Sequence, residues 1–429
     1  MEQTFDVPPI NKKIYGEVTT PYAMVDMVLD MIPRDAYRDG TKWMDAGAGY
    51  GYFAERALHR LGFKREQDIH LCEVNHDHVM KLKRMYSNVH GEDFLVHDGA
   101  YDVIMGNPPY IVSGIKKVPT LGGVDKKNDG VTMWTKFVEK ALALLNEGGY
   151  LAFVVPCLWM RHDKAGIHSL LLQNRVVRVR CFSASQANKL FKGHGQTPVS
   201  IIVVQKASPE LTTELYCDVM KGFVRYPARE SEVLPLCLPE LVRAFALARE
   251  NRGGLHVSKT NTLPKAVIIS PEGSYENIRT VHLDGLVPRS VVENSNIELV
   301  WSGKPKLVLA HKMHGLPYLD KEGKYGISTR DNYIISCDDH TNLSQLQSFF
   351  ETKTVRCLFD AFRYRMRYLE REVFSFIFDP KGVLDDDIDD ESLIAFLGLS
   401  EALADYIREA PLRKYERTCL LYTSPSPRD

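Results

Sequence analysis

The tetrapeptide Asn107-Pro108-Pro109-Tyr110 places two hydrogen-bond acceptors and an aromatic ring at the end of a short apolar run, residues 101–105. The side-chain oxygen of Asn107 and the carbonyl of Pro108 can accept both N–H bonds of an amino group, which leaves the nitrogen lone pair free to attack. The prolines fix φ and stiffen the loop, and Tyr110 offers a face on which a flat base can stack. These residue types suit a reaction at a weakly nucleophilic amine.

A second chemical feature is the glycine-rich stretch DAGAGYG, residues 45–51, which follows an apolar run and precedes a helix-like segment. Glycines let the backbone approach a ligand closely, and Glu73, at the end of the next apolar run, can accept hydrogen bonds from two ribose hydroxyls. A nicotinamide site would show G-x-G-x-x-G, whereas this stretch is G-x-G-x-G behind Asp45. It resembles motif I of S-adenosylmethionine (SAM)-dependent methyltransferases, which implies SAM as the cofactor, with the acidic residue reaching toward its amino-acid part.

Composition limits the classes of protein to which this chain can belong. The chain has 429 residues, 44% of them hydrophobic, which is enough for two or three globular domains. Its net charge of -1 means that a nucleic-acid partner must be held by a local basic patch. Eight cysteines without a C-x-x-C pair argue against disulfides and zinc, so we expect no metal and a reducing, cytoplasmic or similar intracellular compartment. No apolar run has the length of a signal peptide or a membrane span, so we expect no membrane partner.

Alternating strand-like and helix-like segments predict an α/β domain over residues 1–206, with a doubly wound, mostly parallel sheet. Ligands of such sheets bind beyond the carboxyl ends of the strands, where both chemical features lie. We expect seven strands, at 42–46, 68–73, 93–97, 101–105, 150–155, 176–182 and 199–205.

The tetrapeptide NPPY matches the [DNS]-P-P-[YFW] signature of amino-methyltransferases. Together with the SAM-type turn ahead of it, it makes the chain resemble the N6-adenine DNA methyltransferases of the gamma arrangement, the group of the TaqI and Eco57I enzymes. The resemblance implies a class I SAM-methyltransferase sheet followed by a mixed α+β target-recognition domain. It also implies methyl transfer from SAM to N6 of an adenine flipped out of double-stranded DNA at a specific site.

The same resemblance implies roles for individual residues. Tyr15–Pro33 resembles the family's motif X, where Thr20-Pro21 begins a helix that helps to cover SAM. Asp93 matches the acidic position near the adenine ring of the cofactor, and Phe191 matches the second aromatic contact on the extruded base. The implied catalytic residues are Asn107, Pro108, Pro109, Tyr110 and Phe191. The implied cofactor-binding residues are Thr20, Pro21, Asp45, Ala46, Gly47, Gly49, Glu73, Asp93 and Asn107.

The second half of the chain has a different pattern. From about residue 207 short strands and Gly-, Pro- and Asn-containing turns resemble the target-recognition domain, expected at 207–418. Residues 353–373 show helical spacing with an apolar and a basic stripe, and the basic stripe either contacts phosphates or is a solvated face. His311 and His314 have no third ligand nearby and are expected to be ordinary polar positions. Residues 419–429 resemble a translated sequencing adapter and are set aside as a non-native tail.

Other classes of protein fit parts of this pattern. Protein-glutamine N5 methyltransferases also carry NPPY, but they place a helical domain in front of the SAM fold and end soon after it. Ribosomal-RNA amino-methyltransferases fit the second half of the chain less well, and a non-catalytic module would not need every catalytic position filled. Thr20 of motif X lies about twenty residues from the start, too near it for a nuclease domain to come first. We therefore expect a monomeric methyltransferase, with any cognate restriction endonuclease a separate protein. The Gly/Lys-rich segment 111–131 either orders on DNA or is a plain loop.

Overall fold

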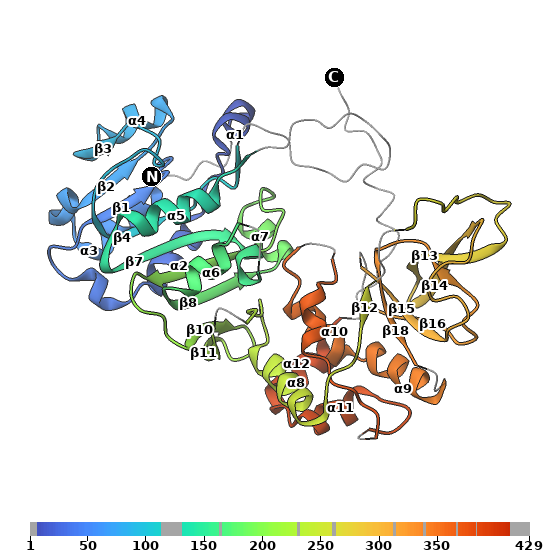
Figure 1. Ribbon diagram of the computed structural model, residues 1–429. Helices are drawn as coiled ribbons and strands as arrows, with labels where there is room; N and C mark the ends of the chain where they lie inside the picture. The colour runs from blue at the N-terminus through green and yellow to red at the C-terminus, as the bar shows by residue number, and fades with distance from the viewer. Residues whose placement is uncertain are drawn as a thin grey trace. The chain divides into compact units, whose positions relative to one another are not determined.

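The described residues divide into two compact units, one within 7–217 and 221–236 and the other within 218–220 and 237–411 (Figure 1). The computed structural model describes residues 7–112, 131–162, 165–229, 232–259, 263–311, 315–337, 340–365, 368–382 and 384–411.

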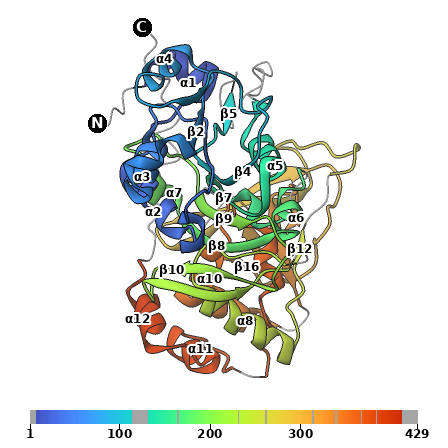
Figure 2. The same cartoon turned by 90° about the vertical axis from the view of Figure 1, so that its left-hand side faces the viewer.

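The first unit is built on a nine-stranded sheet in the order β11-β10-β8-β9-β7-β4-β1-β2-β3, several strands of which lie side by side in Figure 2. Strand β9 runs antiparallel to both β7 and β8, and β11 runs antiparallel to β10. The remaining neighbours are parallel. The structure therefore has the predicted large sheet with mostly parallel neighbours, but the sheet is mixed. It has two strands more than the seven expected. The strands are β1 (Trp43–Ala46), β2 (Ile69–Cys72), β3 (Asn88–His90), β4 (Tyr101–Gly106), β7 (Leu145–Pro156), β8 (Arg175–Phe182), β9 (Val199–Gln205), β10 (Thr212–Cys217) and β11 (Gly222–Pro227).

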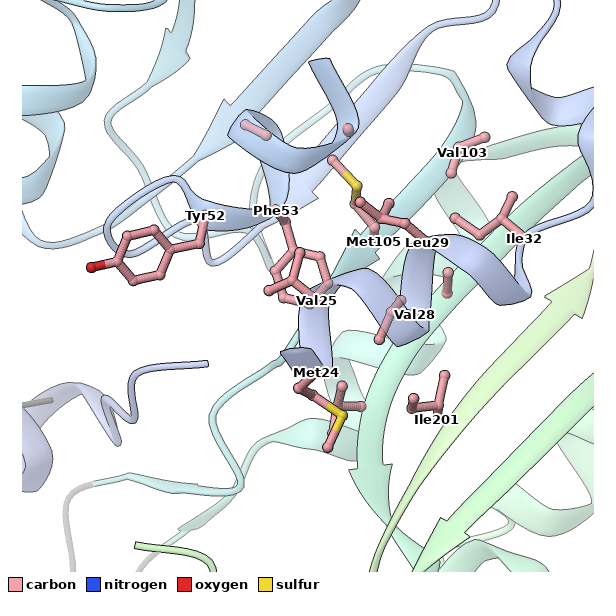
Figure 3. Packing of buried hydrophobic residues seen from close by; sticks show 14 of the residues in the cluster. Met24, Val25, Val28, Leu29, Ile32, Tyr52, Phe53, Val103, Met105 and Ile201 are labelled. Carbon is pink, nitrogen blue, oxygen red and sulfur yellow. The ribbon is translucent and has the colours of Figure 1, made fainter. Parts of the chain in front are cut away.

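Helices pack on both faces of this sheet. Helix α2 (Tyr22–Met31) carries Val25, Val28 and Leu29 against Val103 of β4 and Ile201 of β9, in one apolar core (Figure 3). Figure 1 shows α5 and α6 on the opposite face, where they contact β7 and β8. The other helices of this unit are α1 (Pro9–Tyr15), α3 (Tyr52–Leu61), α4 (His76–Leu82), α5 (Trp134–Leu144), α6 (Ile167–Leu172) and α7 (Ala184–Leu190). A short hairpin pairs β5 (Ile111–Val112) with β6 (Val131–Thr132); the rest of the Gly/Lys-rich segment lies outside the described residues.

The strand predicted at 93–97 is wrong. The third strand is β3, whose His90 pairs with Cys72 of β2. Residues 93–97 form a turn instead, because the Asp93 carboxylate accepts a hydrogen bond from the Leu95 N–H at 3.0 Å. Such an Asx turn competes with strand pairing despite the apolar sequence around it.

The boundary predicted at residue 206 moves to residue 236. Strand β10 continues the sheet by pairing with β8, in a register that sets Glu214 opposite Arg178. Farther along, the Leu234 N–H donates to the Met160 carbonyl at 2.9 Å. Residues 207–217 and 221–236 therefore extend the first unit rather than begin the second.

The second unit combines two small sheets with helices, so the predicted mixed α+β character agrees with its architecture. One sheet has the order β12-β18-β15-β16 and the other the order β14-β13-β17. None of the described helices in either unit is long and apolar enough to cross a membrane. The elements are α8 (Pro239–Arg252), β12 (Ser258–Lys259), β13 (Tyr275–Asp284), β14 (Val287–Ser295), β15 (Lys306–Ala310), β16 (Tyr318–Asp320), β17 (Gly326–Ile327), β18 (Asn332–Ser336), α9 (His340–Glu351), α10 (Lys353–Ala361), α11 (Asp390–Leu397) and α12 (Glu401–Glu409).

The single helix predicted over 353–373 is also wrong. Helix α10 ends at Ala361, where Phe362 leaves helical geometry and its N–H bonds the Phe359 carbonyl at 3.2 Å. The basic stripe was expected to comprise Lys353, Arg356, Arg363, Arg367 and Arg371. The first two lie in α10, Arg363 follows its end and pairs with Asp360 at 2.8 Å, Arg371 begins a separate short helical turn, and Arg367 lies outside the described residues. The proposed basic stripe is therefore not one helix face.

His311 contacts protein groups. Its Nδ1 lies 3.0 Å from the Leu369 carbonyl and 3.2 Å from the Tyr333 hydroxyl, as an ordinary polar position would. Its predicted companion His314 and the predicted tail at 419–429 lie outside the described residues.

A buried ion pair holds one sheet of the second unit. Lys306 of β15 is fully buried and donates to the Asp320 carboxylate of β16 at 2.5 Å. Its ammonium also donates to the carbonyls of Trp301 and Lys304, at 3.0 and 3.1 Å. Burial lowers the pKa of Lys306, while Asp320 raises it. Removal of the carboxylate would leave a buried ammonium without its counter-ion.

We therefore predict that Asp320→Ala lowers the free energy of unfolding by about 3–5 kcal/mol, the usual cost of breaking one side of a buried pair. Urea titration measures this change. Asp284→Ala is the matched control, because Asp284 pairs with Arg289 on an exposed hairpin and its loss should cost about 0–1 kcal/mol. Equal losses in the two variants would contradict a structural role for the buried pair.

Candidate active site

The glycine-rich turn after β1 has a backbone geometry that depends on its glycines. Gly47, Gly49 and Gly51 have φ values of 74°, 53° and 80°, a region that side chains disfavour. A side chain at Gly51 would also approach Leu82 to 2.7 Å. The N–H groups of Gly47 and Ala48 donate to the Cys72 carbonyl at 3.0 and 2.9 Å, which fixes the turn against the end of β2.

A cavity beside this turn encloses about 840 Å³ of space, part of it open to solvent. Its walls come from the segment between α1 and α2, the glycine-rich turn, the ends of β2 and β4, and the turn at Asp93. Seven of the predicted site residues line it: Thr20, Gly47, Gly49, Glu73, Asp93, Asn107 and Pro109. The structure thus brings together most of the predicted cofactor residues and the start of the tetrapeptide.

Glu73 joins the two turns that form the floor of the cavity. One carboxylate oxygen accepts from the Gly49 N–H at 2.6 Å, and the other accepts from the Asn75 N–H at 2.7 Å. Each oxygen keeps further acceptor capacity. The carboxylate can therefore hold the protein backbone and still receive a ligand hydroxyl.

Asp45 does not line the cavity. It lies fully buried beneath the turn, and its Oδ2 accepts from the Ala54 N–H of α3 at 3.2 Å, while its Oδ1 has no partner among the described residues. Burial raises the pKa of Asp45 to about 8, and the charge of Glu73 raises it further, against the lowering effect of the Ala54 N–H. Its neighbour Ala46 is likewise buried in β1. The structure therefore shows Asp45 bonded to α3, away from the predicted contact with the cofactor's amino-acid part.

The start of the tetrapeptide is positioned by close strand packing and by one side-chain hydrogen bond. A side chain at Gly106 would meet the Ala46 carbonyl at 2.7 Å, so only glycine lets β4 approach β1 here. The next residue, Asn107, donates from Nδ2 to Thr20 Oγ1 at 3.0 Å. This bond orients the amide so that Oδ1 remains as an acceptor.

Of the two aromatic residues and three prolines in the predicted site, only Pro109 lines the cavity. Tyr110 is partly buried, and its hydroxyl donates weakly to the Val154 carbonyl at 3.4 Å. Phe191 is 3% exposed and packs in the hydrophobic core. Pro21 and Pro108 do not line the cavity either. The stacking roles of the two rings stay predictions.

Three potential metal ligands lie next to the cavity, at the turn that follows β3. Ligand atoms of His90, Glu92 and His97 lie within 4.8 Å of one another. The same groups already bond within the protein, because His97 contacts Glu92 at 2.6 Å through Nδ1 and Tyr101 at 2.7 Å through Nε2. These bonds fix the turn that carries Asp93.

Three polar residues of the lining were not predicted and have buried side-chain atoms without hydrogen-bond partners within the described chain. They are Glu17, Thr19 and His78. Glu17 stands three residues before Thr20 in the predicted motif X, the only sequence signal that could have marked it.

The charged side chains on the described lining are acidic. They are Glu17, Glu73, Glu92 and Asp93, with His78 as the only basic type and no Lys or Arg among the lining residues described. A phosphate-containing cofactor would meet carboxylates on every side. A cofactor with net positive charge fits this lining.

Comparison with known proteins supports the predicted family resemblance. Residues 49–187 match the family model described as Eco57I restriction-modification methylase. The Type II methyltransferase M.TthHB8I of Thermus thermophilus is 29% identical over 171 residues, which cover 36% of this chain and 38% of that protein. The Type II methyltransferase M.PaeR7I of Pseudomonas aeruginosa is 29% identical over 94 residues, 20% of this chain and 16% of that protein. The matches thus span well under half of either relative.

Solved structures give weaker similarity. The type IIG restriction endonuclease BpuSI is 10% identical, with a TM-score of 0.44 over 92% of this chain and 61% of that chain. A modification subunit of a putative type I restriction enzyme from Vibrio vulnificus is 19% identical, with a TM-score of 0.35 over 47% of this chain and 46% of that chain.

The raised pKa of Asp45 predicts a particular pH dependence of stability. Because the folded protein holds this proton up to about pH 8 and the unfolded chain releases it near the ordinary aspartate pKa of 3.8, the free energy of unfolding should fall as pH rises between these values. The slope contributed by this group is at most about 1.4 kcal/mol per pH unit.

Asp45→Asn should remove this contribution, so the wild type and the variant should differ most in slope between pH 5 and 8. Urea titrations across this range measure the difference. Parallel pH profiles for the two proteins would show that Asp45 is ionised in the fold throughout.

Proposed function

We propose that this protein, whose residues 49–187 match the family model described as Eco57I restriction-modification methylase, transfers a methyl group from SAM to N6 of an adenine in double-stranded DNA. The observation that carries the proposal is the position of Asn107. It begins an amine-binding tetrapeptide and lies on the wall of the same acid-lined cavity as the glycine-rich turn.

The residues of the cavity fit SAM. The cofactor carries a sulfonium and an ammonium group against one carboxylate, so its net charge is positive and complements the four acidic side chains of the lining. We assign Glu73 to the ribose hydroxyls, Asp93 to the adenine ring, and Gly47 and Gly49 to close backbone approach. When bound, SAM supplies an electrophilic methyl group on sulfur.

The protein's part in the reaction is to hold the target amine. The lone pair of an adenine amine is delocalised into the ring, so the site must favour a tetrahedral nitrogen. Asn107 Oδ1 and the Pro108 carbonyl would accept its two N–H bonds, and Thr20 keeps the amide of Asn107 in the required orientation. Pro109 stiffens the loop. Tyr110 would stack on the flipped base, and Phe191 would do so only after becoming exposed.

We assign recognition of DNA to the second unit, residues 237–411 of the described chain. The described residues that line the methyl-transfer cavity all belong to the first unit, so the small sheets and helices of the second unit are available for this role. The protein-glutamine and ribosomal-RNA alternatives use the same tetrapeptide chemistry, so substrates must separate them. Purified protein should methylate plasmid DNA but neither release factor nor ribosomal RNA.

We predict that Asn107→Ala reduces methyl transfer to DNA by several orders of magnitude, because the amine loses an acceptor. Binding of S-adenosylhomocysteine should change by less than about 3-fold, since the acceptor faces the substrate. N6-methyladenine from digested plasmid, measured by mass spectrometry, and calorimetry report the two quantities. Wild-type activity in this variant would refute the assigned chemistry.

Thr20 should act through Asn107. Thr20→Val removes the hydroxyl that accepts the Asn107 N–H, and we expect kcat to fall by about 10-fold, equivalent to the loss of one buried hydrogen bond. Thr20→Ser keeps the hydroxyl and should retain most of the activity. If Val and Ser variants have the same kcat, the hydrogen bond does not position Asn107.

A further inference from the structure

The carboxylate of Glu17 borders the cavity and accepts no hydrogen bond within the described chain. The residue lies between α1 and α2, and its side chain is 12% exposed. Neither carboxylate oxygen has a hydrogen-bond partner in the described chain. Oε1 lies 3.3 Å from His78 Nε2, a contact that is an ion pair only when the imidazole is protonated. Burying an unpartnered carboxylate is costly, so this position is suited to a ligand that brings its own donors.

His78 supplies an independent observation at the same corner. Its side chain is 5% exposed and borders the cavity, yet its Nδ1 also lacks a partner in the described chain. The ring packs edge-on against Tyr50 of the glycine-rich turn, with ring centroids 4.4 Å apart. Two buried polar side chains therefore meet the cavity together, each with unused hydrogen-bonding capacity.

The chemistry of SAM limits which of its groups could bind Glu17. The cofactor offers three kinds of donor: the adenine amine, the ribose hydroxyls and the α-ammonium group of its methionine part. The proposed function uses Asp93 and Glu73 for the first two. The ammonium remains, and as a cation it is the donor that best offsets the charge of a buried carboxylate.

Position along the chain favours the same partner. Thr20, three residues after Glu17, bonds Asn107, beside which the reacting methyl group must lie. The methionine part extends from the sulfur that carries this methyl group. The segment 17–20 therefore borders the methionine end of the cavity rather than the adenine end marked by Asp93.

We propose that Glu17 binds the α-ammonium group of SAM, with His78 as a positioning residue that keeps the carboxylate at the cavity wall. The assignment rests on the proposed use of SAM. It gives Glu17 the contact that the sequence pattern implied for Asp45, which is buried beneath the turn.

A pair of thioether ligands tests the assignment. S-adenosylhomocysteine and 5′-methylthioadenosine share the adenosine and the sulfur, but only the first carries the ammonium and carboxylate groups. Calorimetry with both ligands should show that Glu17→Gln weakens the binding of S-adenosylhomocysteine by about 10- to 100-fold, as expected for a lost charge-assisted hydrogen bond. Binding of methylthioadenosine should change by less than about 2-fold. The melting temperature of the variant should not fall, because a neutral amide relieves the unpartnered charge.

Glu73→Gln is the matched control. Loss of a ribose contact should weaken the binding of both ligands by the same factor, because both contain the ribose. If Glu17→Gln weakens the binding of both ligands equally, or of neither, the Glu17 assignment is wrong. Binding of S-adenosylhomocysteine by the wild type would still support the proposed cofactor. If the wild type binds neither SAM nor S-adenosylhomocysteine, the proposed function and this assignment fall together.

Discussion

The carboxylate of Glu73 is the interaction on which the site depends. It accepts backbone N–H bonds from Gly49 and from Asn75, and so ties the turn after β1 to the turn after β2. Charge-assisted bonds to backbone N–H groups are short and strong, and here they hold a glycine-rich turn that has little conformational preference of its own. Together with the bonds from the Gly47 and Ala48 N–H groups to the Cys72 carbonyl, this tie fixes the floor of the cavity.

The opposite wall depends on a steric constraint. Because Gly106 has no side chain, β4 packs directly against the Ala46 carbonyl of β1, and the tetrapeptide begins where the two strands end. Thr20, which precedes α2, then fixes the amide of Asn107 from a distant part of the sequence. The site is therefore assembled from strand ends and one preceding segment, while the flanking helices supply the apolar core that holds the strands (Figure 3).

Much of this arrangement could be predicted from the sequence. Local signals with strict steric requirements were reliable: the glycine-rich stretch forms a turn after β1, its glycines have positive φ values, and helix α3 begins directly after it. Sequence periodicity failed where side chains compete with regular structure, as at the turn made by the Asp93 carboxylate and at the end of α10.

The position of side chains relative to the cavity was the least predictable property. Motif alignment could not show that Asp45 is bonded beneath the turn or that Phe191 lies in the core, since both depend on how distant segments pack. Glu17 was missed for the same reason. Its single signal was proximity to Thr20, and its lack of donors is visible only in three dimensions.

The most direct measurement of the central claim follows an isotopic label. Purified protein would be incubated with SAM carrying a trideuterated methyl group and with unmethylated plasmid DNA, and the digested nucleosides would be separated by mass spectrometry. The account predicts trideuterated N6-methyladenine. Label on cytosine alone, or no label in DNA while release factor or ribosomal RNA becomes labelled, would contradict it.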